Sequence, residues 1–291
     1  QGIAARAMGN NGLAASRALS DEPDLAVAIF ELSSYQLHYM SSDVRFDGGL
    51  WHSLSPDHLQ WHQSWQSYVD AKARLISRSE RMWLGSPAAQ ALPPALVHKA
   101  KLVDPSTHPL MKLLLGYTHD RENAIYCYHV LQGLGLIADD MALFAASMAS
   151  FPSLPHRCQK VPNSGPFKQV INDSKATNVD SAAKALSAFS RIRWICGGLE
   201  KDGGLGALAG ATEHVARAYV IGREAAGFAV QLDVPTEICG SMQVAVERAM
   251  ADAEPGDTVL LAPAAASFDQ YDNFEHRGED FSARVLERLA D

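Results

Sequence analysis

The strongest constraint on the fold is a regular alternation of short apolar runs with helical segments in the second half of the chain. The apolar runs predict strands at residues 167–171, 192–196, 216–221, 236–239 and 258–261. The segments between and after them predict helices at 181–189, 224–232, 242–253 and 281–289, and another that begins within 203–208. Strands separated by helices of this length form a largely parallel sheet with helices on both faces. The second half therefore predicts a doubly wound α/β domain.

The first half is less regular. Its clearest element is the apolar run Leu25–Leu32, which predicts a strand buried on both faces, as in parallel sheets. Helical spacing predicts helices at residues 60–77, 123–136 and 138–148, whereas residues 83–112 hold five prolines and predict a loop-rich connector. Pro152 and Pro155 mark a boundary, so we predict two domains, residues 1–150 and 151–291.

The formal net charge of −8 argues against non-specific nucleic-acid binding, although a few well-placed cations can still hold a small anion. No apolar stretch reaches the ~18 residues of a membrane span, and no signal peptide is visible. The four cysteines form no C-x-x-C pair and are expected to be buried, reduced thiols. We therefore expect a cytoplasmic protein, most simply a monomer. Because the chain begins with Gln1 rather than Met, we also expect a fragment or a processed form.

Three polar clusters follow three predicted strands, at residues 172–178, 197–201 and 262–274. The carboxyl ends of parallel strands meet at one edge of a sheet, where ligands bind in open α/β folds, so these loops are expected to line one site. Simpler interpretations remain open. Asn178 or Thr177 could only cap a helix, the glycine-rich turn matches no phosphate-binding pattern, and the last loop could be solvated.

In the first half, Glu31 ends the predicted strand, and with Asp57 and His58 it offers ligands suited to Mg²⁺. Lys72 lies on the predicted helix at 60–77. Each has an ordinary alternative, since His58 is one of eleven histidines and Lys72 could be a solvated helix lysine.

Several strings in these segments are together specific. They include E-L-S-S-Y-Q-L at 31–37, S-P-D-H at 55–58, N-D-S-K-A-T-N at 172–178 and S-F-D-Q-Y-D-N-F-E-H-R-G at 267–278. On these residues the chain resembles the Mur ligase family, in its D-glutamate-adding branch. The resemblance implies part of a central ATPase domain followed by a Rossmann-like C-terminal domain. It also implies ATP-dependent joining of D-glutamate to UDP-MurNAc-L-Ala through an acyl phosphate, in peptidoglycan synthesis and hence in cell-wall biogenesis, cell shape and cell division.

The resemblance also implies roles for individual residues. Glu31 and His58 would bind Mg²⁺, together with a carbamylated Lys72, whose new carboxylate would hold a second Mg²⁺. The residues implied to contact UDP-MurNAc-L-Ala are Asn10, Ser33 and Gln36, and those implied to contact ATP are Asn123, Arg157 and Asp173. The residues implied to receive D-glutamate are Lys175, Thr177, Lys201, Ser267, Phe268 and Phe274. Lys72, His58, Lys175 and Lys201 would take part in catalysis.

The family places a uridine-nucleotide-binding domain and a G-T-N-G-K-[ST] phosphate loop before the segment that matches here, and the 291 residues contain neither. We therefore expect negligible ligase activity from these residues alone. The alternative is a non-catalytic ligand-binding or assembly module derived from a Mur ligase. A dinucleotide-dependent oxidoreductase is disfavoured because no G-x-G-x-x-G is present. The choice between D- and L-glutamate stays open.

Overall fold

The structure, a computed structural model, describes residues 2–10, 13–151, 154–163, 165, 167, 169–200, 204–208 and 210–290. The chain forms two compact units, Gln1–Lys112 with Glu122–Met141 and Leu113–Arg121 with Ala142–Asp291. Most of the helix α9 (Met141–Ala149) therefore belongs to the second unit, while a functional domain boundary at residue 150 stays a prediction. None of the described helices combines the length and the apolar character that crossing a bilayer requires.

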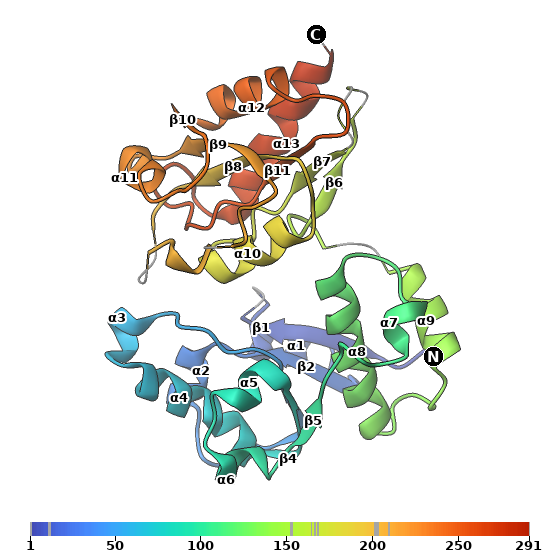
Figure 1. Ribbon diagram of the computed structural model, residues 1–291. Coiled ribbons are helices and arrows are strands. Elements are labelled where there is room, and N and C mark those ends of the chain that lie inside the picture. The colour runs from blue at the N-terminus through green and yellow to red at the C-terminus, as the bar shows by residue number, and fades with distance from the viewer. Residues whose placement is uncertain are drawn as a thin grey trace. The chain divides into compact units, whose positions relative to one another are not determined.

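The second unit is built on a six-stranded sheet in the order β10-β9-β8-β11-β7-β6 (Figure 1). All neighbouring strands are parallel except β6, which pairs antiparallel with β7. The strands are β6 (Gln159–Val161), β7 (Gln169–Asn172), β8 (Ile192–Gly197), β9 (Val215–Ile221), β10 (Thr236–Gly240) and β11 (Thr258–Leu261). The helices are α10 (Val179–Ser187), the 3₁₀ turn η1 (Gly206–Leu208), α11 (Ala225–Ala229), α12 (Met242–Ala251) and α13 (Phe274–Ala290).

Two apolar layers cover the two faces of this sheet. On one face, residues of α10 and α11 pack with alternate strand residues that include Trp194 and Leu260. On the other face, residues of α12 and α13 pack with the intervening strand residues, including Ile195 and Leu261, and Figure 1 shows these two helices together on one side. Burial on both faces explains why these strands are continuous apolar runs. The predicted doubly wound fold is confirmed.

Some predicted elements differ in the second unit. The closing helix begins at Phe274 rather than at 281, and the segment at 203–208 contains a 3₁₀ turn within its described part. The short strand β6 had no prediction, because three residues carry too little periodicity. Cys158 and Cys196 are buried as expected, whereas Cys127, on α8 (Thr118–Gly133) in the first unit, is exposed.

The first unit contains two small parallel sheets, β1-β2 and β3-β4-β5. Its strands are β1 (Ala5–Gly9), β2 (Val27–Glu31), β3 (Phe46–Trp51), β4 (Ser79–Gly85) and β5 (Lys101–Val103). Its helices, besides α8, are α1 (Ala15–Asp21), α2 (Ser34–Tyr39), α3 (Leu59–His62), α4 (Trp65–Arg78), α5 (Ser86–Gln90) and α6 (Pro94–Val97), and α7 (Leu110–Leu113) spans the boundary between the units. The main apolar cluster packs α4 and α5 against β3 and β4, around Val69 and Leu84.

Three expectations for the first unit were wrong. The strand β2 is not buried on both faces, since Ile29 is 52 % exposed and β2 pairs only with β1 within the described chain. The helix expected at 60–77 is interrupted at Gln63, whose positive φ of 65° ends α3 before α4 begins. Residues 83–112 are not a loop-rich connector but carry short strands and helices, because prolines near a helix N-terminus are compatible with a helix.

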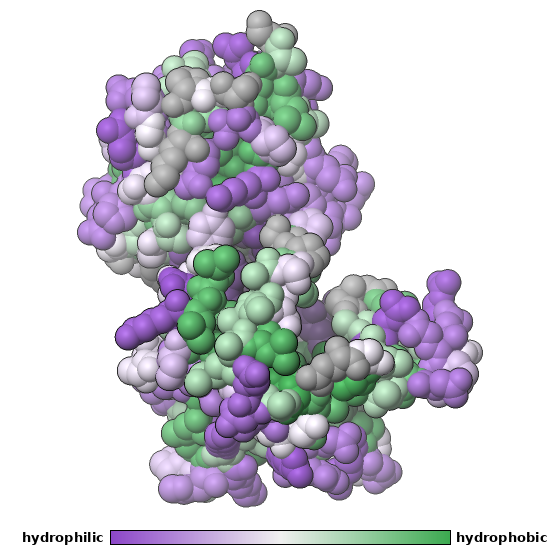
Figure 2. Space-filling view, turned by 90° about the vertical axis from the view of Figure 1, so that its right-hand side faces the viewer, coloured by the Kyte–Doolittle hydropathy of each residue, from purple (hydrophilic) through white to green (hydrophobic). Residues whose placement is uncertain are grey.

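Apolar side chains also remain on the surface. Figure 2 shows hydrophobic residues among hydrophilic ones on the face that it draws. Val230 is 84 % exposed, Leu115 78 % and Phe268 70 %. Scattered exposure of this kind is ordinary for globular proteins, so it assigns no partner by itself.

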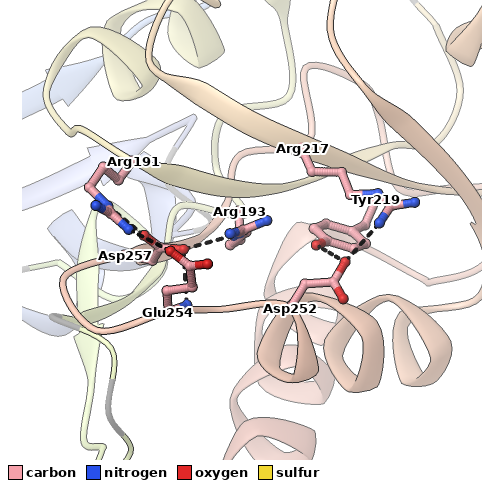
Figure 3. Close-up of polar contacts among 7 residues, drawn as sticks. All are labelled: Arg191, Arg193, Arg217, Tyr219, Asp252, Glu254 and Asp257. Atoms are coloured by element: carbon pink, nitrogen blue, oxygen red, sulfur yellow. Dashed lines mark hydrogen bonds and ion pairs between the residues drawn. The ribbon is translucent and has the colours of Figure 1, made fainter.

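Charged side chains fix the amino ends of β8 and β11 (Figure 3). Asp257, which is 1 % exposed, accepts hydrogen bonds from Arg191 Nε at 2.7 Å, Arg193 Nε at 2.8 Å and the Glu254 backbone N–H at 3.1 Å. Burial alone would raise the pKa of Asp257, but these donors outweigh it and the pKa lies below its usual value. This arrangement ties β8 to β11 at the edge opposite the polar loops.

A second carboxylate repeats the arrangement on β9. Asp252 accepts hydrogen bonds from Arg217 Nη1 at 3.0 Å and from the Tyr219 hydroxyl at 2.8 Å (Figure 3). The two networks lie at the amino ends of the strands, where they serve stability rather than ligand binding.

We predict that Asp257→Asn lowers the free energy of unfolding by about 1–3 kcal/mol at neutral pH, because two guanidinium groups lose a charged acceptor. A carboxylate whose pKa is lowered by folding contributes its full stabilisation above its pKa in the unfolded chain, which is about 3.9. This stabilisation is lost as the pH falls through the lower pKa of the folded protein. The difference from the unaltered protein should therefore be equal at pH 7 and pH 5 and shrink below pH 4 in urea titrations. The exposed Asp233→Asn is the control, and equal stability of D257N at pH 7 would contradict the prediction.

Candidate active site

The three polar loops of the second unit meet because β11 lies between β7 and β8. The Ala264 N–H donates to the Ala176 carbonyl at 2.9 Å, which joins the loop after β11 to the loop after β7. Leu199 and Ala266 exchange backbone hydrogen bonds at 3.0 and 2.9 Å, which joins the loop after β8 to the same loop. The predicted convergence of these loops at one edge is confirmed.

Glycines make this close approach possible. Gly198 has a φ of +133°, and a Cβ atom there would lie 2.2 Å from the Ala266 carbonyl oxygen. Both the backbone conformation and the space therefore require glycine at this position.

The loop after β7 is fixed by two asparagines, one at each end. Asn172, which is fully buried, donates from Nδ2 to the Gly278 carbonyl at 2.7 Å and to Ser282 Oγ at 2.9 Å. Its Oδ1 accepts from the Ser174 N–H at 3.1 Å. At the other end of the loop, Asn178 Oδ1 accepts from the Ser181 N–H at 2.9 Å and caps α10. Asn172 and Asn178 thus hold the loop's shape.

A buried arginine, Arg277, ties this loop to the loop after β11. Its guanidinium donates to Ser174 Oγ at 3.0 Å, to the Ser174 carbonyl at 2.9 Å and to the Ala265 carbonyl at 3.1 Å. Burial lowers its pKa to about 10, and the charge of Asp269 opposes that shift. Arg277 lies within the string at 267–278, but the sequence did not indicate its role. An arginine one helical turn after the N-terminus of α13, next to small residues, was the available signal.

Two of the residues predicted to receive D-glutamate touch each other. Lys175 Nζ lies 4.0 Å from the centroid of the Phe274 ring, a cation–π contact. The Lys175 backbone N–H donates to the His156 carbonyl at 3.1 Å, and the Thr177 N–H donates to the Lys175 carbonyl at 2.7 Å. Lys175, Thr177 and Phe274 are therefore gathered in one place.

Asp173, predicted to contact the nucleotide, is buried and accepts a hydrogen bond from the Cys158 backbone N–H at 3.1 Å. Burial raises its pKa, while the Cys158 hydrogen bond and the charges of His119 and Arg157 oppose the rise. Arg157 is exposed. The structure thus places Arg157 and Asp173 near one another, with His119 as a neighbour that the sequence did not indicate.

Of the remaining predicted residues in this unit, Ser267 is 2 % exposed and Phe268 is 70 % exposed. The Ser267 carbonyl accepts from the Gln270 N–H at 3.1 Å and the Tyr271 N–H at 2.9 Å, which turns the chain toward α13. Lys201 lies outside the described residues.

In the first unit, Asn10 and Glu31 lie together at the carboxyl ends of β1 and β2. The Asn10 N–H donates to the Glu31 carbonyl at 2.8 Å, and Asn10 Nδ2 lies 3.4 Å from Glu31 Oε1. A Cβ atom on Gly9 would lie 2.5 Å from the Glu31 carbonyl oxygen, so glycine permits this contact. An amide and a carboxylate are thereby exposed at a strand edge where ligands bind in α/β folds.

Ser33 and Gln36 contact each other. Ser33 Oγ accepts from the Gln36 N–H at 3.2 Å, and Gln36 Oε1 accepts from the Ser33 N–H at 2.8 Å. This is a capping box at the start of α2. Ser33 and Gln36 therefore have a structural role, in addition to the predicted contact with substrate.

Asp57, His58 and Lys72 form a second group. His58 adopts a left-handed backbone, its N–H donates to Asp57 Oδ1 at 2.9 Å, and its Nε2 lies 3.7 Å from Asp57 Oδ2. Lys72 Nζ lies 5.5 Å from the centroid of the Tyr68 ring and 6.0 Å from that of Trp51. Burial lowers the pKa of Lys72, and the charge of Asp57 opposes that shift.

A buried histidine next to this group, His62, was not predicted. Its Nε2 lies 3.0 Å from Ser34 Oγ, and its Nδ1 has no hydrogen-bond partner within the described chain. Burial lowers its pKa, and the charges of His38, His58 and Lys72 add to the effect. Its spacing of four residues from His58 was the only signal in the sequence.

The fit of this unit to Mg²⁺ rests on donor chemistry. The oxygens of Asn10, Glu31 and Asp57 are ligands that Mg²⁺ accepts. No three His, Cys, Asp or Glu side chains group as a metal site in the part of the chain that is described. The donor types therefore fit Mg²⁺. A single Mg²⁺ site formed by Glu31, His58 and Lys72 stays a prediction. Asn123 is exposed on α8, and its contact with adenine also stays a prediction.

The chain is an α/β protein with polar loops at the carboxyl ends of parallel strands. This arrangement is typical of enzymes that bind nucleotides and other small ligands. Residues 8–83 match the family described as Mur ligase middle domain, and residues 156–265 match the family described as Mur ligase, glutamate ligase domain. The chain belongs to the Mur ligase family.

Two curated relatives are named UDP-N-acetylmuramoylalanine--D-glutamate ligase. The one from Ruegeria pomeroyi is 44 % identical over 91 % of this chain, and the one from Jannaschia sp. is 46 % identical over 90 %. The chain spans 64 % of the length of each.

Solved structures share the fold at low sequence identity. A pseudomurein peptide ligase type C from Methanothermus fervidus has a TM-score of 0.66 at 13 % identity, over 90 % of this chain and 68 % of its own. E. coli FolC, in complex with DHPP and ADP, has a TM-score of 0.64 at 21 % identity, over 93 % and 69 %.

We predict that Arg277→Met lowers the free energy of unfolding by about 2–4 kcal/mol, because three buried acceptor oxygens lose their donors. Urea titration measures the change. Arg288→Met, at an exposed arginine on the same helix, should have little effect. If the two variants unfold alike, Arg277 does not hold the loops together.

Proposed function

We propose that the chain is the central and C-terminal part of an ATP-dependent ligase that joins D-glutamate to UDP-N-acetylmuramoyl-L-alanine in peptidoglycan synthesis. The observation that carries the proposal is the similarity to ligases of that name over 91 % of this chain, together with the meeting of three polar loops at one sheet edge. ATP would phosphorylate the alanyl carboxylate, the glutamate amine would attack the acyl phosphate, and phosphate would leave. A cytoplasmic location remains a prediction.

In the second unit, Lys175, Thr177, Lys201, Ser267, Phe268 and Phe274 would receive D-glutamate. The Phe274 ring holds the Lys175 ammonium in place, so the cation can meet a carboxylate at a low cost in side-chain entropy. Arg157 and Asp173 would contact the phosphates and ribose of ATP. Burial raises the pKa of Asp173, and the charge of Arg157 opposes that rise in part.

In the first unit, Asn10, Ser33 and Gln36 would contact the UDP-sugar substrate, and Asn123 would contact adenine. Glu31, His58 and a carbamylated Lys72 would hold Mg²⁺, which, when bound, neutralises negative charge on the transferred phosphate. The lowered pKa of Lys72 supports carbamylation, because only a neutral amine adds to CO₂. The addition forms an N–C bond and releases a proton, so the cation becomes an anion.

The direct test is product formation. The longest form of the protein that its gene encodes should convert UDP-MurNAc-L-Ala, ATP and D-glutamate to the amide, ADP and phosphate, and L-glutamate should be a poor substrate. Lys175→Ala should raise the KM for D-glutamate at least about tenfold, because a charge-assisted contact is lost. Turnover with no dependence on D-glutamate would refute the proposal.

Carbamylation of Lys72 has its own test. With ¹³C-bicarbonate, the protein should show a carbamate carbon resonance that grows as the pH rises from about 7 to 9, because deprotonation supplies the reactive amine. Lys72→Arg should remove the resonance, while Lys184→Arg, at an exposed lysine on α10, should keep it. A resonance that survives in K72R would show that another amine is modified.

A further inference from the structure

A fourth loop, the one after β9, reaches the edge where the three polar loops meet, and sequence analysis gave it no role. Gly222 has a φ of +103°, and a Cβ atom there would lie 2.7 Å from Asp269 Oδ2 and 3.0 Å from the Gly198 nitrogen. At this position the chain therefore lies against both the loop after β8 and the loop after β11. The next residue is Arg223.

The backbone of Arg223 is held firmly. Its N–H donates to Asp269 Oδ2 at 3.0 Å, and Asp269 is a buried carboxylate two residues after Ser267. The preceding Gly222 N–H donates to the Gly240 carbonyl at 3.0 Å, which also accepts from Gln270 Nε2 at 2.8 Å. The loops after β8, β9, β10 and β11 thus form one connected platform around this position.

The side chain of Arg223 stands in contrast to its backbone. It is exposed, and its guanidinium makes no hydrogen bond or ion pair within the described part of the chain. Arg277, at the same edge, is committed to carbonyl and hydroxyl oxygens. Arg223 is therefore a cation on a rigid loop with its donors available, which is the arrangement that binds an anion at a small ordering cost.

We propose that Arg223 binds the side-chain carboxylate of the amino-acid substrate, an inference that rests on the proposed ligase function. Strands in a sheet are about 4.8 Å apart, so the end of β9 lies about 14 Å from the end of β7, three positions along the sheet. Lys175 and Asp173 follow β7, and the proposed function assigns Asp173 to ATP, so the reacting phosphate and the attacking amine would meet on that side of the edge. The side-chain carboxylate is the part of glutamate farthest from its amine, and in this proposal it would point along the edge toward β9. The planar guanidinium then takes both carboxylate oxygens.

If Arg223 binds this carboxylate, its substitution should reduce the preference for D-glutamate over D-glutamine without unfolding the protein. The test uses the longest form of the protein that its gene encodes. With ADP and UDP-MurNAc-L-Ala present at saturation, calorimetric titration should show that this unaltered protein binds D-glutamate more tightly than D-glutamine. Arg223→Gln should weaken D-glutamate binding about 10- to 100-fold and leave D-glutamine binding unchanged. Arg223→Lys should fall between the two, because it keeps the charge but loses the fork of donors.

Arg288→Gln, at an exposed arginine on α13, is the matched control and should bind both amino acids as the unaltered protein does. Thermal unfolding of R223Q should match that of the unaltered protein, since the side chain has no partner to lose among the described residues. Retained preference for D-glutamate in R223Q would overturn the assignment of Arg223 while leaving the ligase proposal intact. Absence of saturable D-glutamate binding by the unaltered protein would overturn the ligase proposal and the role of Arg223 with it.

Discussion

The arrangement of the second unit depends on the pairing of β11 with both β7 and β8. The last strand of the chain enters the sheet between the first two parallel strands, so its backbone holds them together and brings their loops to one edge. The two apolar layers stabilise this order from either face. Because the loops then lie next to each other, short backbone hydrogen bonds can join them, as between Ala176 and Ala264.

The two edges of this sheet are used differently. At the amino ends, Asp257 and Asp252 bind arginines and a tyrosine, and their charges are compensated within the protein. At the carboxyl ends, backbone groups and the buried Arg277 fix the loops, while the Lys175 ammonium lies against an aromatic ring and the Arg223 guanidinium has no partner in the described chain. Compensated charge stabilises the fold, whereas the Arg223 guanidinium, which has no partner among the described residues, is suited to an anionic ligand.

The strings that carry the family resemblance contain residues with different roles. Within 172–178, Asn172 and Asn178 shape the loop, whereas Lys175 presents a cation. Ser33 and Gln36 satisfy each other's backbone in a capping box, although the resemblance assigns them to substrate. Resemblance alone could not separate residues that shape a loop from residues that would contact a ligand, since one short string contains both kinds.

The sequence by itself determined the doubly wound fold of the second half and the three loops that meet there, because strands buried on both faces are legible as continuous apolar runs. It could not determine β3, which contains no continuous apolar run, or β6, which has only three residues. It also could not determine the exposure of β2, since an apolar run does not reveal how many neighbours a strand has. The role of Arg277 as a clamp and the availability of Arg223 were decided by tertiary structure alone. Both depend on contacts between residues far apart in the chain, and only the folded sheet brings those residues within hydrogen-bond distance.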